Sequence, residues 1–470
     1  MSTARSFRMN ENGVVLVTSI VFMILLAMVG LTAVVMTTTD MKIGANYRDS
    51  EMAFSDSQAG IQYAIGKMEE GLKAWPRTFT LPTTGAVANP LISTFTAPTG
   101  FNFTYPSPEI TELQIGAKPD IYYEFTSAGA GAQGGNVDIT VRVERLPAFM
   151  FGVFGDELLD LGNMAGVYSY SHADCVASSC HPLDPGDSTG DGDIGSNDSV
   201  ILRNNAIVDG DVALGEDTAG SDGVLTDQGG AVTGTMGADI PRVDPDPLGI
   251  FGGELAADFA AYSAANDNGT RITEHPHHAD ITFDSTPKIH TKFAGDSATL
   301  KGQPGGANFY FTEIDVDAKT ALYVDTTLGP VNVYLTGELV AGNGSEVVNT
   351  TDASCGGGAL ATPCNCCVYS PPTLDCTGCT PGAPSDFTIY ANSTNDPTEK
   401  ITLGNSSTFS GTIYAPGIEV VMNNSADIYG SIMAKRVDIV NSVEVYFDTD
   451  IKDKMKSNDL KVVSWRDNRF

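Results

Sequence analysis

Two stretches near the C-terminus, STFSGTIYA at 407–415 and ADIYGSIMA at 426–434, align with each other at an offset of 19 residues. Asn405 and Asn424 precede them at the same offset, and Asn441 follows 17 residues later. Self-similarity near 20 residues is typical of a solenoid, in which each coil contributes short strands and glycine or asparagine takes the corners. The repeat therefore predicts a parallel β-solenoid.

A shorter pattern, with an apolar residue two positions to each side of a glycine, supports the same fold. It occurs five times, centred on Gly210, Gly234, Gly337, Gly411 and Gly430. We expect coils of one solenoid at 196–240 and 320–448, inside a solenoid region of 146–450 that carries insertions at 241–319 and 351–385. An antiparallel sandwich in which the repeat arises by chance is the alternative.

The composition fits a large, acidic, mainly β protein. The chain has 470 residues, of which 58 are acidic and 26 basic, and its net charge is −32. This charge argues against nucleic acid as a partner, because binding phosphates needs clustered lysine and arginine, and against electrostatic attachment to anionic lipid. The 42% hydrophobic content is enough for a core, and the 50 glycines indicate many turns.

The N-terminus departs from this average composition. No charged residue occurs between Asn12 and Thr39, and 14–36 reads VVLVTSIVFMILLAMVGLTAVVM. About 23 apolar residues span roughly 35 Å as a helix, which is enough to cross a bilayer. Arg5 and Arg8 precede the run and predict a cytoplasmic N-terminus, with the rest of the chain outside. A cleavable secretory signal would instead have a shorter apolar run that ends at a small-residue cleavage site. Here the run is long and no such site ends it, which favours a membrane anchor.

The helical pattern continues beyond the apolar run. Apolar and small residues recur near helical spacing from Met41 to Met68, and Pro76 ends the pattern. We therefore expect a helix over 14–75 whose segment 14–36 crosses the membrane. A small α+β region over 76–145 and a C-terminal tail at 451–470 complete the predicted organisation.

The N-terminal region resembles that of PilX-type minor pilins of type IV pili. The resemblance covers residues 10–70 and consists of a short basic leader, Gly13 before the apolar run, the run itself, and the segment TTTDMKIGANYRDSEMAFSDSQAGIQYAI at 37–65. Downstream, GDIGSN at 192–197 and LYVDTTLGPVNVYLTGEL at 322–339 resemble the β-helical region that follows such N-termini. The expected fold class is therefore mainly β, with a pilin-type transmembrane helix followed by a parallel β-solenoid.

The resemblance implies how the chain is processed and where it acts. A prepilin peptidase would cut between Gly13 and Val14, removing leader 1–13, and Val14 would be N-methylated. The helix would lie in the inner membrane and then pack against other pilins in a pilus on the cell surface. Major pilins carry glutamate at the fifth mature position, whereas this chain has Thr18. In this family that absence goes with a tip or initiating position, and so with assembly priming and adhesion.

The sequence leaves three other functions open: an uncleaved membrane-anchored adhesin, a type II secretion pseudopilin, and a carbohydrate-active β-helix enzyme. An enzyme of that kind needs clustered carboxylates with a lysine or arginine in a groove, and basic residues are scarce across the solenoid. No nucleophile-elbow, zinc-protease or P-loop motif occurs. We therefore expect no catalytic residues and no enzymatic activity.

The stretch 187–198 reads DSTGDGDIGSND and has the spacing of a 12-residue calcium loop. Hard oxygen ligands surround Ca²⁺ in such loops, and Gly192 at position six allows the sharp turn. The candidate Ca²⁺ ligands are Asp187, Thr189, Asp191, Asp193 and Asp198. The alternative is a turn rich in aspartate and glycine that leads into the solenoid without a metal.

The candidates for disulfides are eight cysteines: Cys175, Cys180, Cys355, Cys364, Cys366, Cys367, Cys376 and Cys379. The last six of these lie within 25 residues of one another. In an oxidising compartment, disulfides would staple a loop that has no core of its own. Zinc is the rival, although only Cys376 and Cys379 have the usual two-residue gap. Six cysteines allow fifteen pairings, and the sequence does not choose among them.

A histidine-rich run, Glu274-His275-Pro276-His277-His278 followed by Asp280, is a possible transition-metal site. Pro276 prevents the regular helix that would align the imidazoles. An exposed polar loop is therefore the favoured interpretation of the run.

Overall fold

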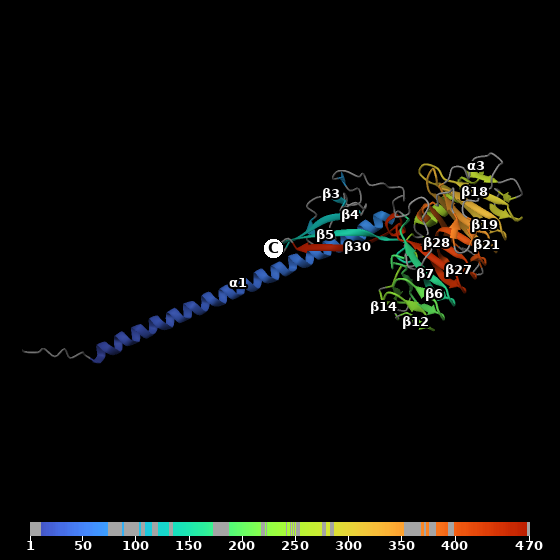
Figure 1. The fold of residues 1–470 in the computed structure, drawn as a ribbon. Helices are drawn as coiled ribbons and strands as arrows, with labels where there is room; N and C mark the ends of the chain where they lie inside the picture. The colour runs from blue at the N-terminus through green and yellow to red at the C-terminus, as the bar shows by residue number, and fades with distance from the viewer. Residues whose placement is uncertain are drawn as a thin grey trace, which may run out of the picture.

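The fold is taken from a computed structural model of the whole chain. The residues described are 11–73, 87–88, 103–104, 109–114, 121–130, 135–172, 188–217, 221, 223–240, 242–244, 246, 248, 250, 254–274, 279–282, 286–351, 368–370, 373–375, 382–392 and 399–467. They form a long helix, a small antiparallel sheet packed on its C-terminal half, and a large parallel solenoid (Figure 1). The predicted fold class, mainly β with a long apolar N-terminal helix and a parallel β-solenoid, is confirmed.

Helix α1 (Glu11–Lys73) is a single element of 63 residues, so it is about 95 Å long. It contains no proline, and hydroxyl groups within its apolar part are satisfied by the helix itself. Ser19 and Thr32 donate to the carbonyls one turn earlier, at Val15 and Met28, over 2.8 Å in both cases. Figure 1 shows the first half of α1 projecting away from the rest of the chain.

The small sheet is antiparallel throughout and packs on the second half of α1. It contains β1 (Val87–Ala88), β2 (Phe103–Thr104), β3 (Glu109–Gln114), β4 (Ile121–Ala130), β5 (Asn136–Pro147) and β30 (Lys456–Asp467). The sequence predicts residues 451–470 as a separate C-terminal tail. In the structure, β30 lies within this range and pairs antiparallel with β5 in the small sheet.

The solenoid is triangular, and long strands bend from one face to the next. The first face holds β7 (Gly166–Tyr170), β10 (Ile207–Val208), β13 (Ala231–Val232), β18 (Ser297–Lys301), β20 (Ala321–Asp325), β22 (Glu346–Thr350) and β29 (Glu444–Asp448). The second face holds β8 (Ile194–Ser196), β11 (Val212–Leu214), β14 (Met236–Asp239) and β25 (Phe387–Ala391). The third face holds β9 (Ser199–Leu202), β12 (Val224–Asp227), β17 (Lys288–Thr291) and β26 (Lys400–Leu403).

Five strands run around corners and join these faces: β6 (Val153–Leu161), β19 (Ala307–Val316), β21 (Val331–Ala341), β27 (Thr408–Met422) and β28 (Asp427–Ile439). Two antiparallel strands, β15 (Ile272–Glu274) and β16 (Ala279–Thr282), pair with β18 and β17 at one end of the stack. The remaining elements are α2 (Glu254–Ala264), α3 (Asn268–Arg271), η4 (Pro384–Asp386), α4 (Ile451–Lys454) and the hairpin of β23 (Val368–Ser370) with β24 (Thr373–Asp375).

The coils are not stacked in sequence order. β28 pairs with β6 and β29 with β7, so the first coil of the chain lies against the last. From this contact between the first and last coils, which we call the seam, the coils from β6 to β14 stack outward in one direction. The segment that contains α2 then leads the chain to the opposite end of the stack. Strands β17, β18 and β19 lie within 241–319, the range predicted as an insertion, and they pair in parallel with other solenoid strands.

The core consists of apolar rows inside the triangle, and it includes fully buried Phe309, Leu335 and Phe409. A second apolar cluster lies outside the second face, where a row of tyrosines meets α2. The rings of Phe259 and Tyr334 lie 5.2 Å apart edge to face, and Tyr414 donates to Asp246 over 2.7 Å. This cluster is why α2 follows the second face.

The repeated residues at 405–442 have distinct corner roles. Asn441 donates to Asn424 over 3.4 Å, and Asn424 to Asn405 over 3.5 Å, so the predicted asparagines form a ladder. The serine after each asparagine takes the left-handed conformation, with φ of 56°, 58° and 58° at Ser406, Ser425 and Ser442. Gly430 lies at another corner with φ of 139°, and a Cβ there would lie 1.8 Å from the carbonyl oxygen of Gly411.

Candidate functional site

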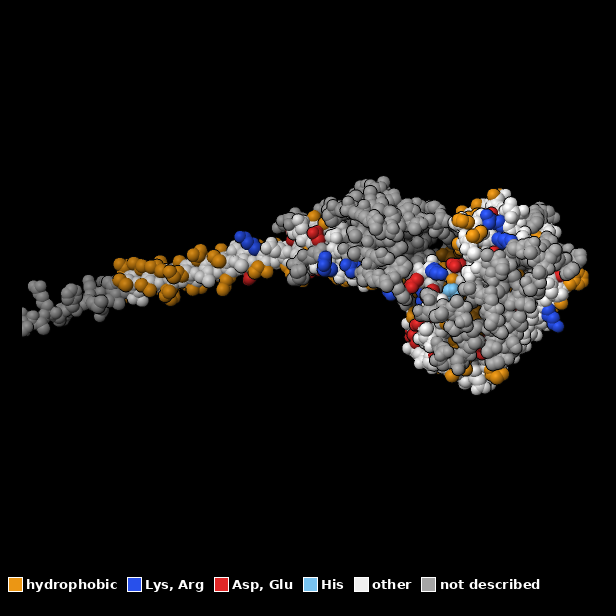
Figure 2. Space-filling model, turned by 45° about the horizontal axis from the view of Figure 1, so that its top comes forward, with side chains coloured by type: hydrophobic (Ala, Val, Ile, Leu, Met, Phe, Trp, Pro, Cys, Tyr) orange, Lys and Arg blue, Asp and Glu red, His pale blue; other side chains and the backbone are white. Residues whose placement is uncertain are grey.

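The most unusual surface of the molecule is the first half of α1. Every residue from Val15 to Tyr47 is exposed, and the large apolar side chains range from 49% exposed at Ile20 to 70% at Met23. Figure 2 shows these hydrophobic side chains along the projecting part of the helix. α1 is long and apolar enough to cross a membrane. An apolar surface of this extent marks a site for another protein or for a lipid phase.

The second half of α1 is held by the small sheet. Ala53, Ile61 and Ala64 are buried there, and the Ser57 hydroxyl donates to the carbonyl of Ser127 over 2.7 Å. A Cβ at Gly129 would lie 1.9 Å from the carbonyl oxygen of Ala53, so glycine is required for this close approach. The packing of its second half on the small sheet therefore holds α1 in place while its apolar first half projects.

The predicted cleavage junction Gly13–Val14 lies in the first turns of α1, which begins at Glu11. Residues 1–10 of the leader lie outside the described residues. Thr18, the position at which major pilins carry glutamate, is exposed on the helix next to the apolar surface.

The predicted calcium ligands are only partly within the described residues, since Asp187 lies outside them. Strand β8 is extended between Asp193 and Asp198 and so holds these two residues apart. Asp193 accepts from the backbone N–H of Asp211 over 2.9 Å and pairs with Lys452 at 3.4 Å. The side chain of Thr189 instead lies 2.8 Å from the Ser169 hydroxyl.

Among the residues that the structure describes, the carboxylates of Asp191, Asp193 and Asp198 do not converge on one point. The backbone N–H of Gly192 donates to the carbonyl of Asp209 over 2.8 Å, which aligns this turn with the next coil. In the structure this segment leads into β8 and β9 of the solenoid.

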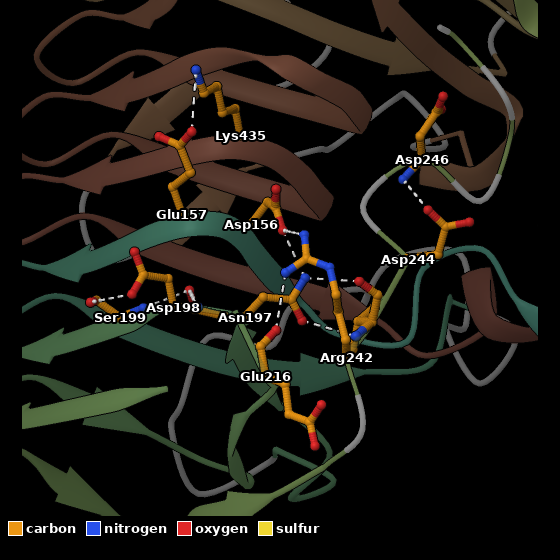
Figure 3. Close-up of polar contacts among 12 residues, drawn as sticks. Asp156, Glu157, Asn197, Asp198, Ser199, Glu216, Arg242, Asp244, Asp246 and Lys435 are labelled. Atoms are coloured by element: carbon orange, nitrogen blue, oxygen red, sulfur yellow. Dashed lines mark hydrogen bonds and ion pairs between the residues drawn. The ribbon is translucent and has the colours of Figure 1, made fainter. Parts of the chain in front are cut away.

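A polar network that the sequence did not reveal fixes the corner beside Asp198 (Figure 3). Fully buried Asn197 donates to Asp156 over 2.7 Å and to the carbonyl of Val243 over 2.8 Å. Arg242 donates to the same Asp156 carboxylate over 2.8 Å and to the carbonyl of Glu216 over 3.0 Å. All these donors and acceptors are mutually satisfied, so the network anchors the segment at 242–244 to the solenoid.

All eight predicted cysteines and His275, His277 and His278 lie outside the described residues. Glu274 and Asp280, which flank the histidines, belong to β15 and β16. Asp280 is the register partner of His290 on β17. No sequence signal connects this run with His290, because the β16–β17 pairing is a property of the fold.

The first face carries a row of stacked tyrosines beside buried acids. The rings of Tyr429 and Tyr446 lie 5.1 Å apart, and those of Tyr446 and Tyr168 lie 5.7 Å apart. The Tyr446 hydroxyl donates to Glu444 over 2.5 Å. Burial, and secondarily the charge of Glu444, raises the pKa of Asp427 to about 7. Burial likewise raises the pKa of Asp448 to about 6.

In comparisons with known proteins, part of the chain matches one family model, and several solved structures resemble the chain remotely. Residues 263–454 match a domain of unknown function, DUF7305, which covers less than half of the chain. No curated protein matches the chain. The crystal structure of the competence-associated pilin ComZ from Thermus thermophilus aligns at 10% identity with a TM-score of 0.31, over 89% of this chain and 97% of that one.

Two ice-binding proteins are also similar in structure. The glycosylated protein LeIBP from an Arctic yeast aligns at 12% identity with a TM-score of 0.25, over 63% of this chain and 90% of that one. Ice-binding protein 1 from Shewanella frigidimarina aligns at 13% identity with a TM-score of 0.26, over 55% of this chain and 93% of that one.

Proposed function

We propose that the chain is a structural subunit of a type IV pilus. The observation that carries this proposal is the division of α1 into two halves. The first half is apolar and exposed along its whole length, whereas the second half is docked on the small sheet. A helix of this kind suits a subunit that is stored in a membrane and then packs against other helices, because both environments cover apolar side chains.

We further propose that the subunit is a PilX-like minor pilin. Leader 1–13 is removed after Gly13, Val14 is methylated, and the helix passes from the inner membrane into a filament on the cell surface. A buried carboxylate is costly unless it is paired, and Thr18 avoids that cost for a subunit that needs no such pairing. Such a subunit belongs at the tip, where it primes assembly and its acidic solenoid takes part in adhesion.

This proposed function requires packing and display, with no catalytic turnover. Two acids of the solenoid illustrate such a structural role: Asp193 binds Lys452 and the backbone, and Asp156 binds Arg242 and Asn197. An uncleaved adhesin and a type II secretion pseudopilin share the helix with this proposal but differ from it in processing or in partner.

The mature N-terminus tests this proposal. The chain is produced with a prepilin peptidase, and the envelope protein is analysed by intact-mass and N-terminal peptide mass spectrometry. The wild-type protein is expected to begin at methylated Val14, and the bulky substitution Gly13→Leu is expected to retain Met1. Gly44→Ala, at a helix position with open space around it, serves as the control and should be processed normally. A wild-type protein that still begins at Met1 would instead support the uncleaved adhesin.

A further inference from the structure

Three metal-ligating side chains meet on the third face of the solenoid. His290 lies on β17 and Asp315 on β19, and the two are parallel register partners. Asp317 follows two residues later, on the same side of the chain. The His290 Nε2 atom lies 3.3 Å from Asp315 Oδ2 and 3.4 Å from Asp317 Oδ2. All three ligand atoms lie within 4.8 Å of one another.

The backbone beneath this cluster is held by buried side chains and by hydrogen bonds. Ile289, Ile314 and Val316 alternate with the cluster residues and are fully buried in the core. The N–H of Asp317 donates to the carbonyl of Thr291 over 3.2 Å, and the Asp317 carbonyl accepts from the Thr320 hydroxyl over 2.7 Å. The three side chains therefore start from positions that are fixed by strands and by a closed turn, as a preformed site requires.

The cluster is also reachable from solvent. The side chains of His290, Asp315 and Asp317 are 35%, 29% and 45% exposed. Partial burial is the largest influence on Asp315 and raises the pKa of its carboxyl, His290 opposes that change, and Asp317 and Glu313 reinforce it. Two carboxylates at this distance repel each other, and a bound cation would relieve that repulsion.

The distances and ligand types indicate which cation fits. Bonds of about 2.05 Å in a tetrahedral site place neighbouring ligand atoms roughly 3.3 Å apart. The separations from His290 to Asp315 and Asp317 match this spacing. Imidazole suits first-row transition metals and Zn²⁺, whereas Ca²⁺ and Mg²⁺ prefer an all-oxygen set.

We propose that His290, Asp315 and Asp317 bind one first-row divalent cation of the Zn²⁺ type, with the remaining coordination position open to solvent. Figure 1 shows the neighbouring β18 and β19 at the end of the molecule remote from the projecting part of α1. The proposed site on β17 and β19 therefore lies in a part of the solenoid remote from the projecting half of α1. Its open position takes an oxygen or nitrogen ligand from water or from a surface that the solenoid meets.

The experiment is a titration of the full-length protein in detergent with Co²⁺ and Zn²⁺, followed by absorption spectroscopy and calorimetry. The expected result is one equivalent of Co²⁺ whose spectrum lacks a thiolate charge-transfer band. His290→Ala and Asp317→Asn should each weaken binding at least 10-fold. Glu419→Gln, which removes one negative charge from another coil of the same face, should leave binding unchanged. Unchanged thermal unfolding of the metal-free variants shows that the coil is intact.

Three results would overturn the metal site. Equal binding by the wild type and His290→Ala would show that the His290 imidazole is not a ligand of the cation. A site with only a thiolate spectrum would assign the cation to cysteines. Loss of binding in His277→Ala/His278→Ala together with full binding in His290→Ala would assign it to the histidine-rich run. None of these outcomes depends on whether the chain enters a pilus.

Discussion

The first half of α1 and the solenoid core contain the same kinds of side chain in opposite environments. Met23 on α1 is 70% exposed, whereas Val333 and Leu335 in the solenoid are fully buried. Burial of apolar area is the main favourable term in folding, so the solenoid stabilises itself by covering these side chains. The first half of α1 leaves the same kinds of side chain exposed, and the proposed packing against a membrane or other helices would cover them.

The largest expected effect comes from truncating a leucine to alanine in the solenoid core and, for comparison, on the exposed half of α1. Leu335→Ala leaves a cavity in a closed core and is expected to lower the free energy of unfolding by about 4 kcal/mol. Leu25→Ala on the exposed part of α1 should leave the unfolding of the solenoid unchanged. Denaturant unfolding of the full chain in detergent, followed by circular dichroism, measures both values. Equal losses for the two variants would show that α1 and the solenoid are not energetically separate.

Replacing a glycine by alanine should also have different effects in the solenoid and on the exposed half of α1. Gly430 has φ of 139°, and an added Cβ would lie 1.8 Å from a neighbouring carbonyl oxygen, so Gly430→Ala should destabilise the solenoid by about 3 kcal/mol. Gly44 on α1 has open space around it, and Gly44→Ala should strengthen the helix slightly, by about 1 kcal/mol or less. The same unfolding assay distinguishes them, and a neutral Gly430→Ala would refute the tight corner.

A buried acid makes the stability of the solenoid depend on pH. The pKa of Asp427 is raised from its ordinary value of 3.8 to about 7, so the folded state holds a proton that the unfolded state loses. Stability therefore falls as pH rises from about 4 to about 7. Asp427→Asn should match the wild type near pH 4 and gain on the order of 2 kcal/mol at pH 8. Asp239→Asn, at an exposed site, is the control. A gain that is equal at both pH values would contradict this cause.

The smallest expected effect concerns a charge pair on the outside of the solenoid. Lys400 and Glu419 lie 2.7 Å apart on adjacent coils, with side chains 42% and 31% exposed. Pairs of this kind contribute little, because water screens them, so Glu419→Gln should change the free energy of unfolding by less than about 0.5 kcal/mol. A loss of several kcal/mol in chemical unfolding would show that ion pairs between coils, and not the apolar core, determine stability.

The sequence predicted the elements of this fold but not their order in space. Period and composition revealed the solenoid, the apolar helix and the asparagine corners, because each is a local pattern. The seam between β28 and β6 was not predicted, since it joins residues such as Asn163 and Asn441 that lie 278 positions apart. The same applies to β30, whose partner strand lies more than 300 residues earlier in the chain.

The candidate sites follow the same rule. The helix surface was visible in the sequence because it is contiguous. The spacing at 187–198 resembled a metal loop, but β8 is extended between Asp193 and Asp198 and separates them. The cluster of His290, Asp315 and Asp317 has no recognisable spacing, because parallel pairing across one coil brings its members together.

The most direct test of the account is photo-crosslinking from the exposed half of α1 in assembled filaments. A photoreactive amino acid replaces Leu25 on the helix or, as a control, Leu328, which is 61% exposed on the solenoid. We expect sheared filaments to contain the chain, the probe at Leu25 to crosslink to another pilin, and the probe at Leu328 not to do so. Absence of the chain from filaments, with the Leu25 probe crosslinked only to lipid, would contradict this expectation.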